Sequence, residues 1–110
     1  MIFLAFREAA FVAGEIHFLE KNMTRVAVIS VIVENISENG KSIEELNEIL
    51  HGYGEFIIGR MGIPYKARNV GIISVAIDAP QDTISTLSGV IGKLPGVSVK
   101  TALSGVASDE

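Results

Sequence analysis

The sequence predicts an α+β fold with the element order βαββαβ, and three observations lead to that prediction. Residues 25–33 and 70–78 are apolar and rich in β-branched side chains, as is typical of buried strands. Two segments with the apolar spacing of amphipathic helices, residues 43–50 and 84–94, are each followed by glycine and a further strand. The two halves therefore repeat one strand–helix–strand unit. With right-handed crossovers, this order produces a four-stranded antiparallel sheet, strand order 4-1-3-2, with both helices on one face.

The composition describes one globular domain. The chain has 110 residues, 48% of them hydrophobic and 20% charged, which is enough for a single modest core. Its formal net charge of −4 argues against a domain that binds nucleic acid by itself. The absence of cysteine excludes disulfides, thiolate metal sites and cysteine nucleophiles. No apolar run reaches the ~20 residues that span a bilayer, so we expect a cytoplasmic protein without a membrane segment.

Three regions are expected along the chain. Residues 1–22 are rich in aromatic and aliphatic side chains but lack the positive start and cleavage site of a signal peptide. We interpret them as an N-terminal extension outside the fold, which an over-called translation start would explain. An extra helix that packs on the sheet or on a partner is the alternative. Residues 23–104 form the folded domain, and residues 105–110 form a flexible tail.

The first strand–helix unit begins at residues 25–33. Both alternating faces of this strand are apolar, which places it in the centre of the sheet. After a polar loop, Ser42 and Glu45 have the spacing of a capping box at the start of the helix. Gly52 is expected to end the helix in the left-handed conformation. The buried stripe of this helix is predicted to be Ile43, Leu46, Ile49 and Leu50.

The second unit begins with a strand at residues 55–63. Pro64 belongs at a strand end or edge, because proline cannot donate to a ladder. A hairpin at residues 65–69 leads to the strand at residues 70–78. Pro80 is expected at the first position of the second helix, and the last strand covers residues 97–103. The second helix is predicted to bury Ile84, Leu87, Ile91 and Leu94.

The second face of this sheet is predicted to stay open. Ile72, Ala76 and one face of the first strand would then meet water. Because exposed apolar areas of several hundred square ångströms mark interfaces, we expect an oligomer that forms through this face and through strand edges.

Two pairs of glycines interrupt predicted elements. Gly89 and Gly92 weaken the second helix by about 1 kcal/mol each relative to alanine, which close approach of another backbone would offset. Gly59 and Gly62 interrupt the second strand, which indicates a bulge or a ligand that approaches the backbone.

The chain carries few groups that could do covalent chemistry. His17 and His51 are its two imidazoles, and neither has a second ligand at helical or hairpin spacing. His51 is interpreted as a partner of the helix dipole in the last turn of the first helix. We interpret the acidic run of that helix (Glu44, Glu45 and Glu48) as a solvated face, with a docking surface for a basic partner as the alternative.

Basic residues gather near the hairpin. Arg60, Lys66 and Arg68 lie within nine positions, beside Met61, Tyr65 and Asn69. One interpretation is a site for a small anion, with the arginines as bidentate donors. The other is a charged hairpin that protects a sheet edge from aggregation.

Three segments, residues 46–54, 57–65 and 87–100, resemble the iron-only hydrogenase system regulator family. The specific piece is the motif Gly-Arg-Met-Gly-Ile-Pro-Tyr at residues 59–65, whereas Leu-Pro-Gly-Val at residues 94–97 is common in ACT-type regulatory domains. The resemblance covers residues 23–104. It implies a ferredoxin-like fold, similar to ACT domains and to the C-terminal sensor domain of nickel-responsive repressors.

The same resemblance limits what can be carried over. Nickel-responsive sensors hold metal with histidines and a cysteine on their middle strands, and neither residue type occurs between residues 55 and 78. We therefore expect no metal site, no cofactor and no direct binding of nucleic acid. ACT domains bind amino acids near the first strand–helix loop at a dimer interface, and Asn35, Asn39 and Gly40 are the equivalent here.

The function predicted is a non-catalytic, ACT-like sensor or regulator that works as a dimer or tetramer. A small ligand would bias assembly or partner binding, and any effect on transcription would run through another protein. A passive assembly module in hydrogenase maturation is the main alternative. An acylphosphatase-like enzyme is a remote one, because the loop at residues 34–40 has no arginine and begins with an acid. The candidate ligand-binding residues are Asn35, Asn39, Gly40, Arg60, Met61, Gly62, Tyr65 and Arg68.

Overall fold

The structure, a computed structural model, describes residues 2–3 and 23–105, and its elements follow the predicted order. Two helices alternate with four long strands, which confirms the βαββαβ order. A two-residue strand, β1, precedes them. The elements are β1 (Ile2–Phe3), β2 (Thr24–Glu34), α2 (Gly40–Gly52), the 3-10 turn η1 (Gly54–Phe56), β3 (Ile57–Tyr65), the 3-10 turn η2 (Lys66–Arg68), β4 (Val70–Pro80), α3 (Gln81–Gly92) and β5 (Val97–Leu103).

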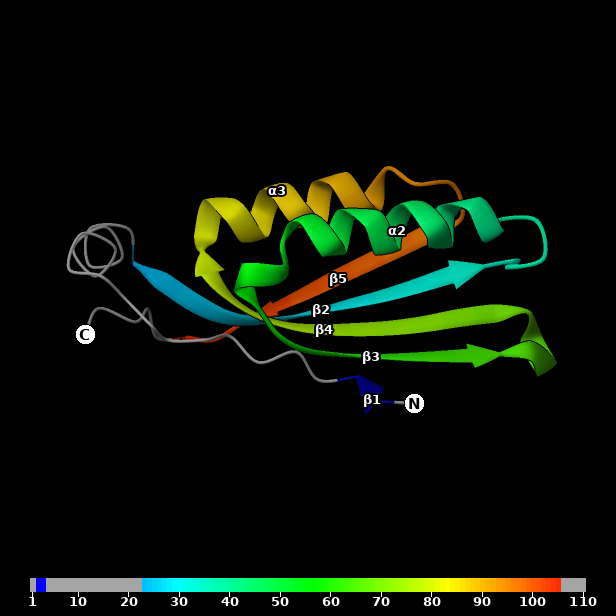
Figure 1. The fold of residues 1–110 in the computed structure, drawn as a ribbon, viewed down its shortest axis with the longest axis horizontal. Coiled ribbons are helices and arrows are strands. Elements are labelled where there is room, and N and C mark those ends of the chain that lie inside the picture. Colours follow the sequence, from blue (N-terminus) through cyan, green and yellow to red (C-terminus); the bar gives the residue numbers. More distant parts are fainter. Residues whose placement is uncertain (1, 4–22, 106–110) are drawn as a thin grey trace.

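The strands form one antiparallel sheet in the order β1-β3-β4-β2-β5, and both helices lie on the same side of it (Figure 1). The four long strands therefore have the predicted order, with β2 and β4 in the centre. Ile2 pairs with Met61 and Phe3 with Arg60 at the outer edge of β3. The rest of the segment 1–22 and residues 106–110 lie outside the described residues, so the proposed extension and tail stay predictions.

The register of β2 explains how one strand can be apolar on both faces. Ala27, Ile29, Val31 and Val33 are buried beneath the helices, as are Val75 and Ile77 of β4 beside them. The alternate residues of β2 face the uncovered side, and Ile32 there is 44% exposed. The helices complete the core with Leu46 and Leu50 of α2 and with Ile84, Leu87 and Ile91 of α3. The prediction of an open apolar face is thus confirmed for the part of the chain that the structure describes.

Three predictions about helix ends are wrong. Helix α2 starts at Gly40, so Ser42 lies in its first turn and is buried, where its Oγ donates to the carbonyl of Pro95 at 2.8 Å and does not cap the helix. Gly52 is the last residue of α2 and does not adopt the left-handed conformation, since the amide of Tyr53 bonds to the carbonyl of Leu50 and the chain continues into a 3-10 turn. Pro80 ends β4 and precedes α3, which starts at Gln81.

The four glycines have different surroundings. Ile57 pairs with Ile77 and Gly59 with Ala76, so Ile58 is an extra residue and the predicted bulge is confirmed. A Cβ at Gly89 would meet nothing within 4 Å, and one at Gly92 would meet only a methyl of Val99 at 4.0 Å. No backbone of the described chain therefore approaches α3 at these glycines.

Neither α2 nor α3 is long and apolar enough to cross a membrane.

Candidate functional site

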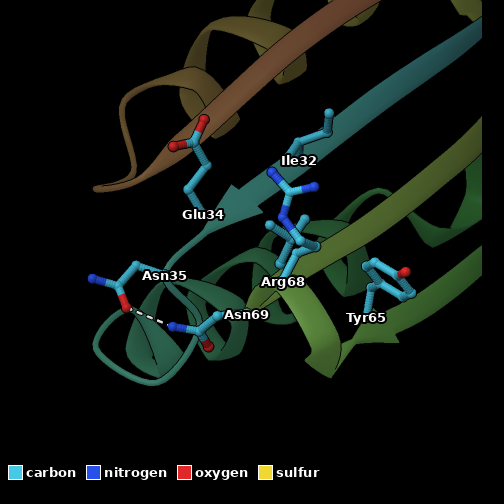
Figure 2. Close-up of a pocket in the computed structure, with 7 residues that line it drawn as sticks. Ile32, Glu34, Asn35, Tyr65, Arg68 and Asn69 are labelled. Carbon is cyan, nitrogen blue, oxygen red and sulfur yellow. Dashed lines mark hydrogen bonds between the residues drawn. The ribbon is translucent and has the colours of Figure 1, made fainter.

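A hollow of about 640 Å³ lies on the uncovered face of the sheet, at the end where β3 turns into β4. Figure 2 shows side chains from three places around it: the end of β2, the loop that follows β2, and the β3–β4 turn. Its lining residues are Ile32, Glu34, Asn35, Tyr65, Arg68, Asn69 and Val70. The hollow thus joins two regions that the sequence indicated separately, the hairpin and the loop before the first helix.

The hairpin geometry brings Tyr65 and Arg68 to this end of the sheet. Tyr65 pairs with Val70, and the single turn η2 between them closes with a hydrogen bond from the amide of Asn69 to the carbonyl of Lys66 at 3.1 Å. Asn69 adopts the left-handed conformation, φ 57°, which reverses the chain into β4. Because Val70 also pairs with Glu34 of β2, these side chains share the uncovered face.

Two asparagines tie the hairpin to the loop after β2. The side-chain amide of Asn69 donates from Nδ2 to Asn35 Oδ1 at 2.7 Å, as Figure 2 shows, and to Ser37 Oγ at 3.0 Å. The side-chain oxygen of Asn69, Oδ1, accepts from the backbone N–H of Ser37 at 3.1 Å. The backbone carbonyl of Asn69 accepts from the backbone N–H of Ile36 at 3.0 Å. Asn35 is left-handed as well, with φ 55°. The two loops that form this end of the hollow therefore hold each other in place.

The electrostatics of the hollow depend on Arg68. Its guanidinium extends from the turn toward the side of β2 that carries Ile32 (Figure 2). Arg68 is exposed and forms no hydrogen bond or ion pair within residues 2–3 and 23–105. Glu34 is the acidic group of the hollow, Tyr65 adds a phenol, and Ile32 and Val70 are apolar. An unpaired guanidinium beside a phenol and apolar walls can bind a carboxylate or phosphate through two parallel hydrogen bonds.

The structure does not bring Arg60 to this hollow. Arg60 pairs with Val75, whose side chain is buried beneath the helices, so Arg60 lies on the helix-covered face. There its Nη2 donates to Asn47 Oδ1 of α2 at 2.7 Å. Gly62 is on the same side, opposite Ile73, whereas Met61 lies on the uncovered face opposite Ser74. The predicted group of Arg60, Tyr65 and Arg68 is therefore divided between the two faces of the sheet.

The contacts of Asn39 indicate a structural role in the fold, and the surroundings of Gly40 show no requirement for a glycine. The side-chain amide of Asn39 donates to the backbone carbonyl of Glu34 at 2.7 Å. This bond fixes the loop at the start of α2. The same amide packs against Gly96, whose φ of 75° and lack of a side chain allow the contact. A Cβ at Gly40 would meet nothing within 4 Å, so no close approach requires this glycine.

Asn69, Glu34, Ile32 and Val70 line the hollow without having been among the candidate residues. Asn69 carried a usable signal, because asparagine between a short turn and a strand favours the left-handed conformation. Glu34, Ile32 and Val70 carried none, since only the strand register places them beside Arg68. In the part of the chain that the structure describes, no three residues of the types His, Cys, Asp and Glu gather as a metal site.

Comparisons with known proteins agree on one family. Residues 25–101 match the family model "TM1266-like: Iron-only hydrogenase system regulator, putative". Among solved structures, the chain is similar to the uncharacterized protein TM1266 from Thermotoga maritima, with 35% identity and a TM-score of 0.68. That match covers 73% of this chain and 96% of the other. No curated protein matches the chain.

Proposed function

This chain belongs to the TM1266-like family of iron-only hydrogenase system regulators, and from that premise we propose that it is a non-catalytic, ligand-sensing regulator that works as an oligomer. A small anion binds in the hollow beside Arg68, at an interface between copies of the chain. The bound ligand changes the assembly, or its affinity for a partner protein, in the cytoplasm. Any effect on transcription runs through that partner.

The observation that carries this proposal is the unpaired Arg68 guanidinium in a preformed hollow. A guanidinium that has no partner within residues 2–3 and 23–105 is free to form charge-assisted hydrogen bonds with an incoming anion. The hydrogen bonds between Asn35 and Asn69 already order both loops beside it. Binding therefore does not have to supply the entropy of ordering those loops, which favours affinity for a small ligand.

The position of the hollow supports a role at a subunit interface. Ile32 and Tyr65 belong both to the hollow and to the uncovered apolar face of the sheet. A second copy that packs on this face would cover the open side of the hollow and remove the ligand from water. The anion would then contact both copies, which couples ligand binding to assembly by mass action.

Native mass spectrometry of the protein purified from its own cells without dialysis tests this proposal. A small molecule retained at fixed stoichiometry to an even-numbered oligomer is the expected result. Arg68→Gln should lose this molecule, and Lys66→Gln is the matched control, because Lys66 is exposed in the same turn but does not line the hollow. Retention of the molecule by Arg68→Gln at the wild-type ratio would show that the site is elsewhere.

A second candidate function is supported by the extent of the apolar face. An assembly module would use this face to hold proteins of hydrogenase maturation together, without a small-molecule signal. The same experiment separates the two candidates. A ligand-free oligomer that carries another protein would favour the assembly module.

A further inference from the structure

We propose a second binding site, between α2 and β3, that takes a small aliphatic monocarboxylate with its carboxylate on Arg60. A hollow of about 250 Å³ lies there, on the opposite face of the sheet from Arg68. Its lining includes Arg60, Gly62 and Pro64 of β3 and Ile43 and Asn47 of α2. At the ~30 Å³ that a water molecule occupies in the liquid, this volume corresponds to roughly eight non-hydrogen atoms.

The hollow exists because β3, beyond Arg60, presents little side-chain volume to the helix. Arg60, Gly62 and Pro64 are its helix-facing residues here, opposite Val75, Ile73 and Gly71. A Cβ at Gly62 would meet nothing within 4 Å, although the residue is half-buried. Protein interiors are normally close-packed, and glycine weakens a strand. The missing side chain therefore leaves room for a ligand that approaches the backbone of β3.

Arg60 supplies the charge at the edge of this hollow. It is half-buried, and its one side-chain hydrogen bond within residues 2–3 and 23–105, from Nη2 to Asn47 Oδ1, leaves most of its five N–H donors available. Asn47 orients the guanidinium without neutralising it. Glu44 and Glu48 flank Asn47 on α2, but they are exposed, and neither forms an ion pair with Arg60 in the described chain.

The walls determine the rest of the ligand. Ile36, Ile43, Ile73 and Pro64 are apolar, so they favour an aliphatic body of matching size. One cation in an apolar surrounding suits a single negative charge. A phosphate dianion would be desolvated without a second partner, which is unfavourable. The expected ligand class is thus a short-chain carboxylic acid in its ionised form.

Titration of the full ¹⁵N-labelled chain with pentanoate, followed by amide NMR shifts, tests this site. Saturable shifts are expected at Gly62, Gly71 and Asn47. Arg60→Gln should weaken the affinity by about tenfold or more, the effect of a hydrogen bond to a charged group. The neutral analogue 1-pentanol should bind correspondingly more weakly. Lys66→Gln is the matched control, because Lys66 is exposed in the β3–β4 turn and does not line this hollow, and it should leave pentanoate binding unchanged.

Gly62→Val separates a ligand site from a packing defect. Its side chain would fill the hollow, so pentanoate binding should be lost while the unfolding temperature stays equal or rises. If Gly62→Val does not fold, the pentanoate affinity of Arg60→Gln alone tests the proposal. Absence of saturable shifts at Gly62 and Gly71, or equal affinity in Arg60→Gln, would overturn the proposal. Neither result would bear on the function proposed for Arg68, because that residue lines a different hollow and is tested by the molecule retained in native mass spectrometry.

Discussion

At the scale of single residues, two asparagines determine the shape of the candidate ligand site. Asn35 and Asn69 both adopt positive φ angles, which cost most other residues about 1–2 kcal/mol. Their side chains offset that cost with hydrogen bonds to each other and to Ser37. Arg68 depends on this arrangement, since the turn that presents it ends at Asn69.

Substitutions at Asn69 should separate backbone strain from lost hydrogen bonds. Asn69→Ala removes the side-chain bonds and keeps a Cβ at positive φ, so we expect a loss of about 2–4 kcal/mol in the free energy of unfolding. Asn69→Gly removes the same bonds without the strain and should lose less, about 1–2 kcal/mol. Urea unfolding of both variants measures the difference. Equal losses would mean that strain at Asn69 is unimportant.

At the scale of elements, long-range contacts decide where the helices begin and end. Ser42 has the local spacing of a capping residue, yet it is buried and bonded to Pro95, 53 positions away in the sequence. The contact ties the first turn of α2 to the connection between α3 and β5. Local capping signals are therefore overruled where a buried hydroxyl can satisfy a distant carbonyl.

Helix α3 offers a test of what Gly89 is for. A Cβ at Gly89 would meet nothing within 4 Å among the described residues, so Gly89→Ala should raise the free energy of unfolding by about 1 kcal/mol through helix propensity. If another copy packs its backbone against α3, the same substitution should weaken the oligomer instead. Thermal unfolding at low protein concentration measures the first effect, and sedimentation at high concentration measures the second. A stabilised variant with unchanged assembly would exclude α3 as a close-packed interface.

At the scale of the whole molecule, the two faces of the sheet have different surroundings. The helices cover one face completely enough that Ile29, Val33 and Ile77 have no exposed surface. The other face keeps large apolar side chains in water, among them Val26, Val28, Ile32, Ile63, Tyr65 and Ile72. Burial of such side chains contributes about 25 cal/mol per Å², and this gain is the physical basis for the interface proposed on this face.

A matched pair of valines should locate the interface. Val28 lies on the uncovered face and is 40% exposed, and Val90 lies on α3 and is 38% exposed. Val28→Asp should dissociate the oligomer into monomers, because a carboxylate would be buried without a partner. Val90→Asp should leave it intact. Sedimentation velocity measures both. Dissociation by Val90→Asp alone would assign the interface to the helical side.

The sequence predicted the fold well because hydrophobic periodicity is a local signal. The apolar alternation along β4 and the apolar stripes of both helices were enough to indicate which residues of these elements face the core, among them Val75, Leu46 and Leu87. The candidate site was harder to predict, because closeness in sequence does not place two side chains on the same face of a sheet. Arg60 and Arg68 are only eight positions apart, yet Arg60 lies opposite buried Val75 on the covered face, whereas Arg68 lies in the turn after Tyr65 and lines the hollow on the uncovered face.

The sequence by itself determined the element order, the strand order, the open apolar face and the resemblance to one family, since each depends on which residues are apolar and on short motifs. Only the tertiary structure decided that Asn35 and Asn69 meet, that Arg68 shares their hollow with Glu34, and that Arg60 contacts Asn47 on the far side. Such contacts join residues up to 34 positions apart. They depend on strand register and on how the two loops fold against each other, which no local pattern in the chain records.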